Sequence, residues 1–276
     1  MLDDDSRADL GELDDDDLLT AVGPVSADVV GRCVGVVGGR GGAGASTLAA
    51  ALAVAAASST RVALLDLDPL GGGLDLLLGL EDTAGLRWPA LAAATGRLSS
   101  SALAAALPAV SGVAVLSWDC GDLMSVPAEA VWSVVDAALR GFDVVVLDLP
   151  RGLDATAAPA VERCDELLMV VPAEVRAVAA ASRLVRVLAG SDVPVRAVVR
   201  GPAPSGLTGP EVAAFLGVPL AGWLRSEPRL HRSVDKGVLG GLSRRGPLAM
   251  LCAGLVEGLL SEDRRARAST TSAVAA

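Results

Sequence analysis

A glycine-rich segment between an apolar run and an alanine-rich run constrains the fold of this 276-residue chain more than any other feature. Residues 33–37 are apolar throughout, and their length suits a strand buried on both faces of a parallel sheet. Residues 38–44 contain five glycines. Residues 45–57 are nearly all Ala, Leu and Val, which predicts a helix that is covered on every side. The segment therefore predicts a buried strand, a glycine loop and a buried helix in succession.

The spacing within this loop matches a phosphate-binding loop except at one position. Four residues separate Gly39 from Gly44, and Ser46 follows two positions later. Glycines let the backbone turn tightly and bring its N–H groups to an anion, and the start of the next helix adds partial positive charge. The usual loop has Lys immediately before its Ser or Thr, but Ala45 stands there. We therefore expect a backbone cradle for phosphate that lacks the positive charge of the usual Lys. The alternative is a tight glycine turn that binds no ligand.

Two of the later strands predicted from the sequence end in carboxylates. One ends at Asp66, with Asp68 two residues further on, and the other ends at Asp148. Ligands of open α/β sheets bind at the carboxyl ends of the strands, so these acids are expected beside the glycine loop. The candidate Mg²⁺ ligands are Ser46, Asp66 and Asp148, and Asp68 is the candidate for positioning an attacking water. Taken singly, an Asp at such a position is often only a helix N-cap.

Apolar strand patterns alternate with helical patterns along the rest of the chain. Further strands are expected at 113–118, 166–171, 193–199 and 218–224, and helices at 127–139, 177–188, 209–216, 228–236 and 247–260. The alternation predicts an α/β fold, a doubly wound and mostly parallel sheet with helices on both faces. Residues 31–261 are expected to form one domain. An acidic disordered tail is expected at 1–30, and a disordered C-terminal tail at 262–276.

Charge is concentrated at the N terminus. Residues 1–17 contain nine acids and one Arg, so this segment carries −8 of the total net charge of −10. The nearly neutral remainder lacks the basic surface that nucleic-acid binding requires. No apolar run reaches the roughly 18 residues of a membrane-spanning helix, and the acidic N terminus is unlike a signal peptide. The four cysteines lie far apart without metal-binding spacing, which favours buried thiols in a reducing compartment, so a cytoplasmic protein is expected.

Three segments in combination resemble the MinD/ParA group of deviant Walker ATPases. They are residues 39–47, 66–72 and 148–151. The sequence is most similar to the CpaE/TadZ branch, which includes actinobacterial septum-site-determining proteins, and residues 229–237 are similar to a late helix of that branch. The resemblance covers about residues 33–260. It implies a P-loop NTPase fold that binds ATP and Mg²⁺, a homodimer, protein partners in division or pilus and secretion machinery, and recruitment to a pole or septum.

The loop departs from the pattern of this family at two positions. The family has lysines where this chain has Arg40 and Ala45. The first Lys reaches the partner's phosphates in a nucleotide-sandwich dimer, a role that the resemblance transfers to Arg40 although Arg is not equivalent to Lys. Arg200 stands where the family often has Asn for adenine. The expected nucleotide-binding residues are Gly39, Arg40, Gly41, Gly42, Ala43, Gly44, Ala45, Ser46, Thr47 and Arg200.

Three functions remain open at this point. The first is a MinD/ParA-like positioning protein with a degenerate loop and weak or absent ATP hydrolysis, acting in septum-site determination or in localisation of a Tad-type pilus or secretion machine. The second is a competent ATPase in which Arg40 or a cation from a partner substitutes for Lys, with Arg40 and Asp68 as the candidate catalytic residues. The third is a scaffold that binds no nucleotide. Nucleotide binding and turnover by the purified protein would separate the three.

Overall fold

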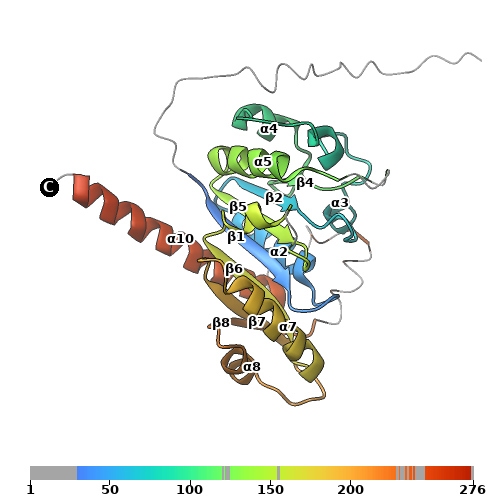
Figure 1. Cartoon of the computed structure of the whole chain (residues 1–276), viewed down its shortest axis with the longest axis vertical. Helices are drawn as coiled ribbons and strands as arrows, with labels where there is room; N and C mark the ends of the chain where they lie inside the picture. The colour runs from blue at the N-terminus through green and yellow to red at the C-terminus, as the bar shows by residue number, and fades with distance from the viewer. Residues whose placement is uncertain are drawn as a thin grey trace, which may run out of the picture.

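The structure is a computed structural model that describes residues 30–119, 121, 125–153, 156–227, 230, 234, 236–237, 239 and 246–274, with side chains as far as residue 261. An eight-stranded sheet forms its centre, in the order β3-β4-β2-β5-β1-β6-β7-β8 (Figure 1). The strands are β1 Arg32–Gly38, β2 Val62–Asp66, β3 Ala109–Val110, β4 Val113–Leu116, β5 Val144–Leu149, β6 Glu166–Pro172, β7 Val195–Gly201 and β8 Leu220–Arg225. All neighbouring strands are parallel except the pair β3 and β4.

Helices follow most strands and cover both faces of the sheet. They are α2 Ala45–Ala56, α3 Leu74–Leu78, the short 3₁₀ helix η1 Trp88–Leu91, α4 Ser100–Ala106, α5 Ala128–Gly141, α6 Ala158–Val161, α7 Val175–Leu188, α8 Gly209–Leu216 and α10 Pro247–Val274. The doubly wound α/β fold expected from the alternating sequence pattern is therefore confirmed.

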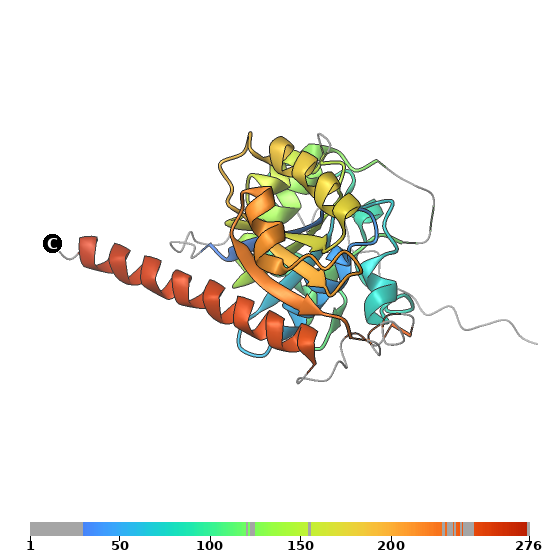
Figure 2. The same cartoon turned by 90° about the horizontal axis from the view of Figure 1, so that it is seen from below.

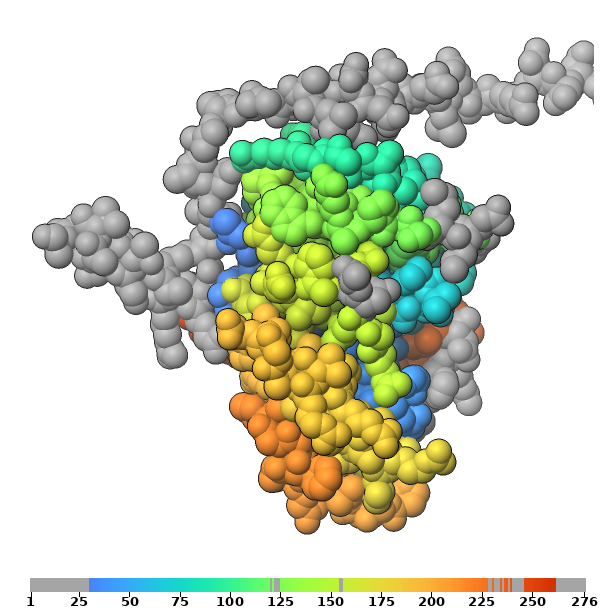
Figure 3. All heavy atoms as spheres, viewed as in Figure 1, coloured from blue at the N-terminus to red at the C-terminus, as the bar shows by residue number. Residues whose placement is uncertain are grey.

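Two hydrophobic cores lie on opposite faces of the sheet because successive strand residues point to opposite sides. In β1, Cys33 and Val37 enter one core and Val34 and Val36 enter the other. Helices α4 to α8 supply the first core, and Figure 3 shows α5 in green and α7 in gold over that face. Helices α2, α3 and α10 supply the second core. Burial on both faces explains why the central strands are continuously apolar.

Helix α2 is the most enclosed helix near the predicted loop. Ala49, Ala50 and Ala53 are fully buried, and the helix packs against β1, β5 and α10. Alanine side chains permit close approach between these layers, so the alanine-rich run fixes the start of α2 against the carboxyl ends of the central strands. The glycine loop before it is thereby held at that edge of the sheet.

Several segments differ from the sequence-based expectation. Strand β3 was not expected; it is only two residues long and pairs antiparallel with β4. Helix α10 continues to Val274 and extends away from the body of the molecule (Figures 1 and 2), whereas a disordered tail was expected at 262–276. Residues 262–267 are Glu, Asp, Arg and Ala, and most of these have high helix propensity. Most of the tail expected at 1–30 and most of the helix expected at 228–236 lie outside the described residues.

Within the described part of the chain, no helix combines the length and the apolar composition that crossing a bilayer requires.

Candidate functional site

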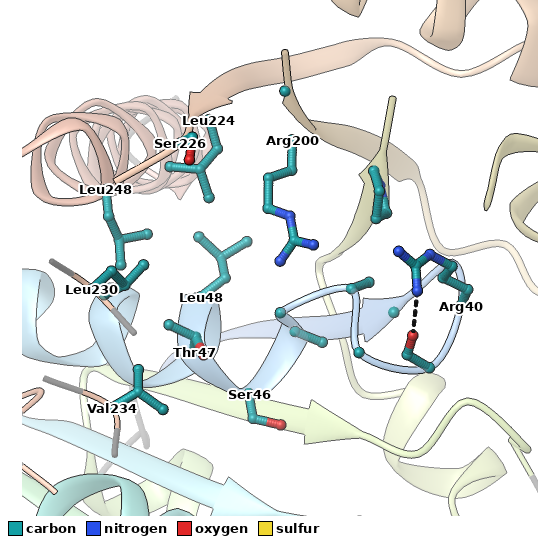
Figure 4. Close-up of a pocket in the computed structure, with 18 of the residues that line it drawn as sticks. Arg40, Ser46, Thr47, Leu48, Arg200, Leu224, Ser226, Leu230, Val234 and Leu248 are labelled. Atoms are coloured by element: carbon teal, nitrogen blue, oxygen red, sulfur yellow. Dashed lines mark hydrogen bonds between the residues drawn. The ribbon is translucent and has the colours of Figure 1, made fainter. Parts of the chain in front are cut away.

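A cavity of about 670 Å³ lies at the carboxyl ends of the central strands (Figure 4). It is lined by the glycine loop, the start of α2, and the last residues of β5, β6, β7 and β8 with the segments that follow them. The residues predicted from the sequence that line this cavity are Arg40, Gly41, Gly42, Ala43, Gly44, Ala45, Ser46, Thr47, Asp68, Asp148 and Arg200. The structure thus brings most of the candidate site residues around one space, as the strand-end argument predicts.

Two loop glycines have backbone conformations that other residues rarely adopt. Gly42 has φ of 67°, and Gly44, the residue before α2, has φ of 98°. A Cβ atom built on Gly42 would meet no atom within 4 Å, so this part of the loop faces open space. The first N–H groups of α2 have no partner within the helix. Together these groups form a backbone cradle suited to an anion.

Gly39 has a packing role and does not line the cavity. Its N–H donates to the carbonyl of Val170 at 2.9 Å. A Cβ atom on Gly39 would lie 2.8 Å from the Cβ of Ala181 in α7, which is too close for two carbon atoms. Glycine at this position therefore lets the loop lie directly against α7.

Ser46 and Asp148 form the part of the site that fits a magnesium ion. Asp148 is only 3% exposed, and the Ser46 side chain lies close enough to stabilise its charged form. Burial is the main cause that raises the pKa of Asp148 to about 7, the charges of Asp66 and Asp68 add to it, and the Ser46 hydroxyl opposes it. A cation would favour the charged carboxylate. Mg²⁺ commonly takes one or two protein oxygens and completes its shell with water and phosphate, so this pair fits it.

Asp66 lies beneath the loop that follows β2 and does not line the cavity. It is the register partner of Asp148 on the adjacent strand. Its carboxylate accepts hydrogen bonds of 3.1 Å from the N–H groups of Asp68 and Leu74 and from the Ser117 hydroxyl. Burial is the largest cause that raises its pKa to about 6. These partners show that Asp66 organises the loop, whereas the sequence argument placed it among the metal ligands.

Asp68 lines the cavity on the side of β2. Its Oδ1 accepts a hydrogen bond of 3.2 Å from the N–H of Leu70, which leaves Oδ2 without a recorded partner among the described residues. The side chain of Leu70 is 79% exposed, so the loop carries an apolar residue at the surface beside this carboxylate. This position is compatible with the expected role of Asp68 in orienting a water.

Arg40 is bound within its own protomer. Its Nη2 lies 3.1 Å from both carboxylate oxygens of Glu174, and its Nη1 donates to the carbonyl of Gly41 at 3.1 Å (Figure 4). Glu174 lies two residues after the end of β6 and is the residue immediately before α7. The sequence analysis missed Glu174, although an acid just beyond a predicted strand is the same signal that identified Asp68.

Arg200 points from β7 toward the glycine loop (Figure 4). A Cβ atom on Gly44 would lie 3.2 Å from Nη1 of Arg200, so the guanidinium contacts the loop at the start of α2. Burial is the main cause that lowers the pKa of Arg200, and the positive charge of Arg40 adds to this effect. The resemblance had placed Arg200 at a nucleotide base.

An apolar group lines the cavity on the other side of Arg200 from Arg40 (Figure 4). It comprises Leu48, Leu224, Leu230, Val234 and Leu248. These residues come from α2, β8, α10 and the segment between β8 and α10. The sequence analysis did not find this group, because only the tertiary structure brings such distant segments together.

Known proteins show where this fold and sequence recur. No family model matches the chain. An uncharacterized protein of Mycobacterium tuberculosis strain H37Rv is 47% identical over 221 residues, which cover 80% of this chain and 62% of that protein. The septum site-determining protein MinD of Synechocystis is 27% identical over 215 residues, which cover 75% of this chain and 80% of that protein. The chain thus spans less than two thirds of the mycobacterial relative.

Solved structures match almost the whole described fold. A ParA family ATPase from Chlorobium tepidum superposes with a TM-score of 0.73 at 19% identity, covering 82% of this chain and 98% of that chain. The septum site-determining protein MinD from Pyrococcus horikoshii, complexed with Mg-ADP, superposes with a TM-score of 0.71 at 20% identity, covering 83% and 95%. These likenesses concern the fold.

Proposed function

The chain belongs to the MinD/ParA-type superfamily of P-loop ATPases, and from this membership we propose that it is a nucleotide-binding positioning protein with weak or absent ATP hydrolysis. The observation that carries the proposal is the cavity in which the loop cradle, Ser46 and Asp148 meet while Ala45 leaves the usual Lys position without charge. The cradle can bind phosphate, and the missing cation weakens stabilisation of the transferred phosphoryl group.

Ser46 and Asp148 would hold Mg²⁺ between the protein and the phosphates of ATP. The metal would supply positive charge on the β5 side of the phosphate chain. The protein contributes a buried carboxylate whose charged form is costly without a cation. Binding of ATP is therefore expected to depend on Mg²⁺.

A homodimer is the proposed active assembly. In this proposal two copies face each other across the loop and the 66–75 region, and Arg40 reaches the partner's phosphates. The exposed Leu70 supplies apolar surface on that face. A solved structure of the MinC:MinD cell division protein complex from Aquifex aeolicus has the same fold, which supports protein partners as a further part of the proposal.

The proposed cellular roles are septum-site determination and localisation of a Tad-type pilus or secretion machine, in the cytoplasm with recruitment to a pole or septum. The septum-site role has support from relatives that are named septum site-determining proteins. A fluorescent fusion of the full chain tests it: we expect a focus at pole or septum that Ser46→Ala disperses. A uniform distribution of the unsubstituted fusion, with normal cell lengths and normal pili after gene deletion, would contradict these roles.

Calorimetric titration and phosphate release test the biochemical proposal. We expect ATP binding at about micromolar affinity or weaker in the presence of Mg²⁺, a large loss with EDTA or Ser46→Ala, and no loss with Ser58→Ala, an exposed serine outside the cavity. Phosphate release is expected near background. Brisk turnover would favour the competent ATPase. Absence of binding at millimolar ATP would favour the nucleotide-free scaffold.

A further inference from the structure

Arg200 is a half-buried cation that has no partner of its own among the described residues. Within the described residues its guanidinium forms no hydrogen bond and no ion pair, although it lines the cavity. Glu174, the acid whose charge acts on it, is already bound by Arg40. Partial burial without a countercharge makes the guanidinium less stable than it is in water, and an anion entering the cavity would offset that cost.

The position of Arg200 is fixed by the sheet. It stands in register with Pro172 of β6 and Leu224 of β8, so two neighbouring strands hold its backbone. Its Nη1 would lie 3.2 Å from a Cβ atom on Gly44, the residue that begins the turn into α2. The guanidinium is therefore presented to the same space as the free N–H groups of the loop.

We infer that Arg200 supplies, from β7, the positive charge that the loop lacks at Ala45, and that it binds the phosphate chain of the nucleotide. This inference rests on the proposed nucleotide binding. Figure 4 shows Arg200 and Ser46 on opposite sides of the start of α2. The phosphate chain lies between them, with the N–H groups of the loop beneath it and the Ser46–Asp148 pair on the β5 side. A guanidinium can donate two parallel hydrogen bonds to phosphate oxygens.

The surroundings of Arg200 favour phosphate over the nucleotide base as its ligand. The guanidinium contacts the loop, whereas the apolar group of Leu48, Leu224 and Leu248 lies beyond it in the cavity. A base gains from apolar and planar surfaces, and that group offers such a surface. The expected ligand is a nucleoside di- or triphosphate, held by Arg200 at its phosphates and by the apolar group at its base.

A double-mutant cycle on the full chain tests this role. The affinities of ATP, ADP, AMP, adenosine and inorganic triphosphate are measured with Mg²⁺ for wild type, Arg200→Ala, Ala45→Lys and the double variant. Arg200→Ala should weaken ATP, ADP and triphosphate roughly tenfold or more and leave adenosine nearly unchanged. Ala45→Lys should increase the ATP affinity of the Arg200→Ala variant by a larger factor than it increases the ATP affinity of wild type. The reason is that both positive charges would contact the same phosphates.

The controls separate charge from folding. Arg183→Ala removes one exposed charge from α7 outside the cavity and should leave every affinity unchanged. Arg200→Lys keeps the positive charge and should therefore keep part of the ATP affinity. If Arg200→Ala has a lower unfolding temperature than wild type, Arg200→Gln is measured in its place. Equal losses for adenosine and ATP would assign Arg200 to the base and overturn the inference. Unchanged or tighter ATP binding by Arg200→Ala would also overturn it. A wild type that binds none of the probes would overturn the proposed function together with the inference.

Discussion

The guanidinium of Arg40 and the carboxylate of Glu174 form an ion pair in which one nitrogen lies 3.1 Å from both oxygens. The side chains are 36% and 46% exposed, so solvent screens the pair and its net contribution to stability is about 0–1 kcal/mol. Such a pair can hold Arg40 in a defined place and still release it at low cost. Arg40 is therefore held within its own chain by an exposed pair, which the phosphates of a second copy could displace in the proposed dimer.

Release of Arg40 should strengthen nucleotide-dependent association. Glu174→Gln removes the competing carboxylate charge, and we expect dimerisation with Mg²⁺ and ATP to become about two- to fivefold tighter, which corresponds to up to about 1 kcal/mol. Arg40→Ala should weaken it. Sedimentation velocity over a concentration series measures both effects. Glu162→Gln, an exposed acid outside the cavity, serves as the control. A protein that stays monomeric at high concentration with nucleotide would contradict the dimer.

The buried Asp148 should make the nucleotide-free protein less stable as pH rises. Its pKa is about 7 in the fold against 3.8 for the free side chain, so between these values the folded state binds more protons than the unfolded chain. The stabilisation by this group is complete below about pH 4 and is lost as pH rises through 7. Asp66, raised to about 6, acts in the same direction over a narrower range.

Asp148→Asn should remove most of this pH dependence. Relative to wild type, the variant should gain on the order of 3 kcal/mol of unfolding free energy at pH 8 and little at pH 4. Urea unfolding from pH 4 to 8 without nucleotide or Mg²⁺ measures the difference. Asp82→Asn, at an exposed position outside the cavity, is the matched control. Parallel curves for wild type and Asp148→Asn would show that this carboxylate does not set the slope.

Two loop glycines should respond differently to an added methyl group. The Cβ of Gly39→Ala would lie 2.8 Å from Ala181, so the change should overpack the contact with α7 and cost about 1–3 kcal/mol of unfolding free energy. Gly41→Ala meets no atom within 4 Å and should cost less than about 0.5 kcal/mol. Urea unfolding of both variants without nucleotide measures the difference. Similar losses in the two variants would indicate that backbone freedom, and not contact with α7, requires glycine at Gly39.

Local patterns predicted the parts of this molecule that local forces determine. The apolar runs predicted the strands of the parallel sheet, because a strand that is buried on both faces is apolar throughout. The glycine-rich segment predicted the turn into α2, because a tight turn requires glycine. The position of Asp148 followed from the rule that ligands meet strand ends. The confirmed sheet and the cavity at its edge are the results of these signals.

The remaining features depend on which strands become neighbours. Arg40 meets Glu174 only because β6 lies beside β1, and Arg200 reaches Gly44 only because β7 lies next in the sheet. Asp66 faces the expected edge of the sheet, but its partners include Ser117, which follows a different strand. Strand order is a tertiary property, so local sequence patterns could not predict these contacts between residues of different strands.

Removal of residues 1–30 should leave the fold intact. Among the described residues the buried core begins at Cys33, and the first backbone contact outside the sheet is the N–H of Gly31 with the carbonyl of Leu139. The melting temperature should shift by less than about 2 °C, since 1 kcal/mol moves the midpoint by about 2–4 °C in a domain of this size. Differential scanning calorimetry of the two forms measures it. A drop of several degrees would mean that the acidic segment packs on the domain.

Turnover should be limited by the charge missing at Ala45, because Asp68, the candidate for positioning a water, already lines the cavity. In the proposed function the cradle binds phosphate and the Ser46–Asp148 pair holds Mg²⁺ in the ground state, while Arg200 contacts the loop from the β7 side. A Lys at the usual position follows the phosphoryl group as it moves, and loss of such a cation commonly lowers the rate by orders of magnitude. Only interactions that strengthen in the transition state accelerate the reaction, so wild-type phosphate release should lie near background.

Ala45→Lys should then raise phosphate release by roughly tenfold or more, provided that Asp68 can position water. Adding Asp68→Ala to Ala45→Lys should return the rate to the wild-type level while ATP affinity stays near that of Ala45→Lys. Adding Asp82→Asn instead controls for loss of one exposed negative charge. The measurement is single-turnover phosphate release at saturating ATP and Mg²⁺. Brisk release by wild type that Asp68→Ala abolishes would contradict the degenerate loop, because the site would then already contain its full catalytic charge without Lys.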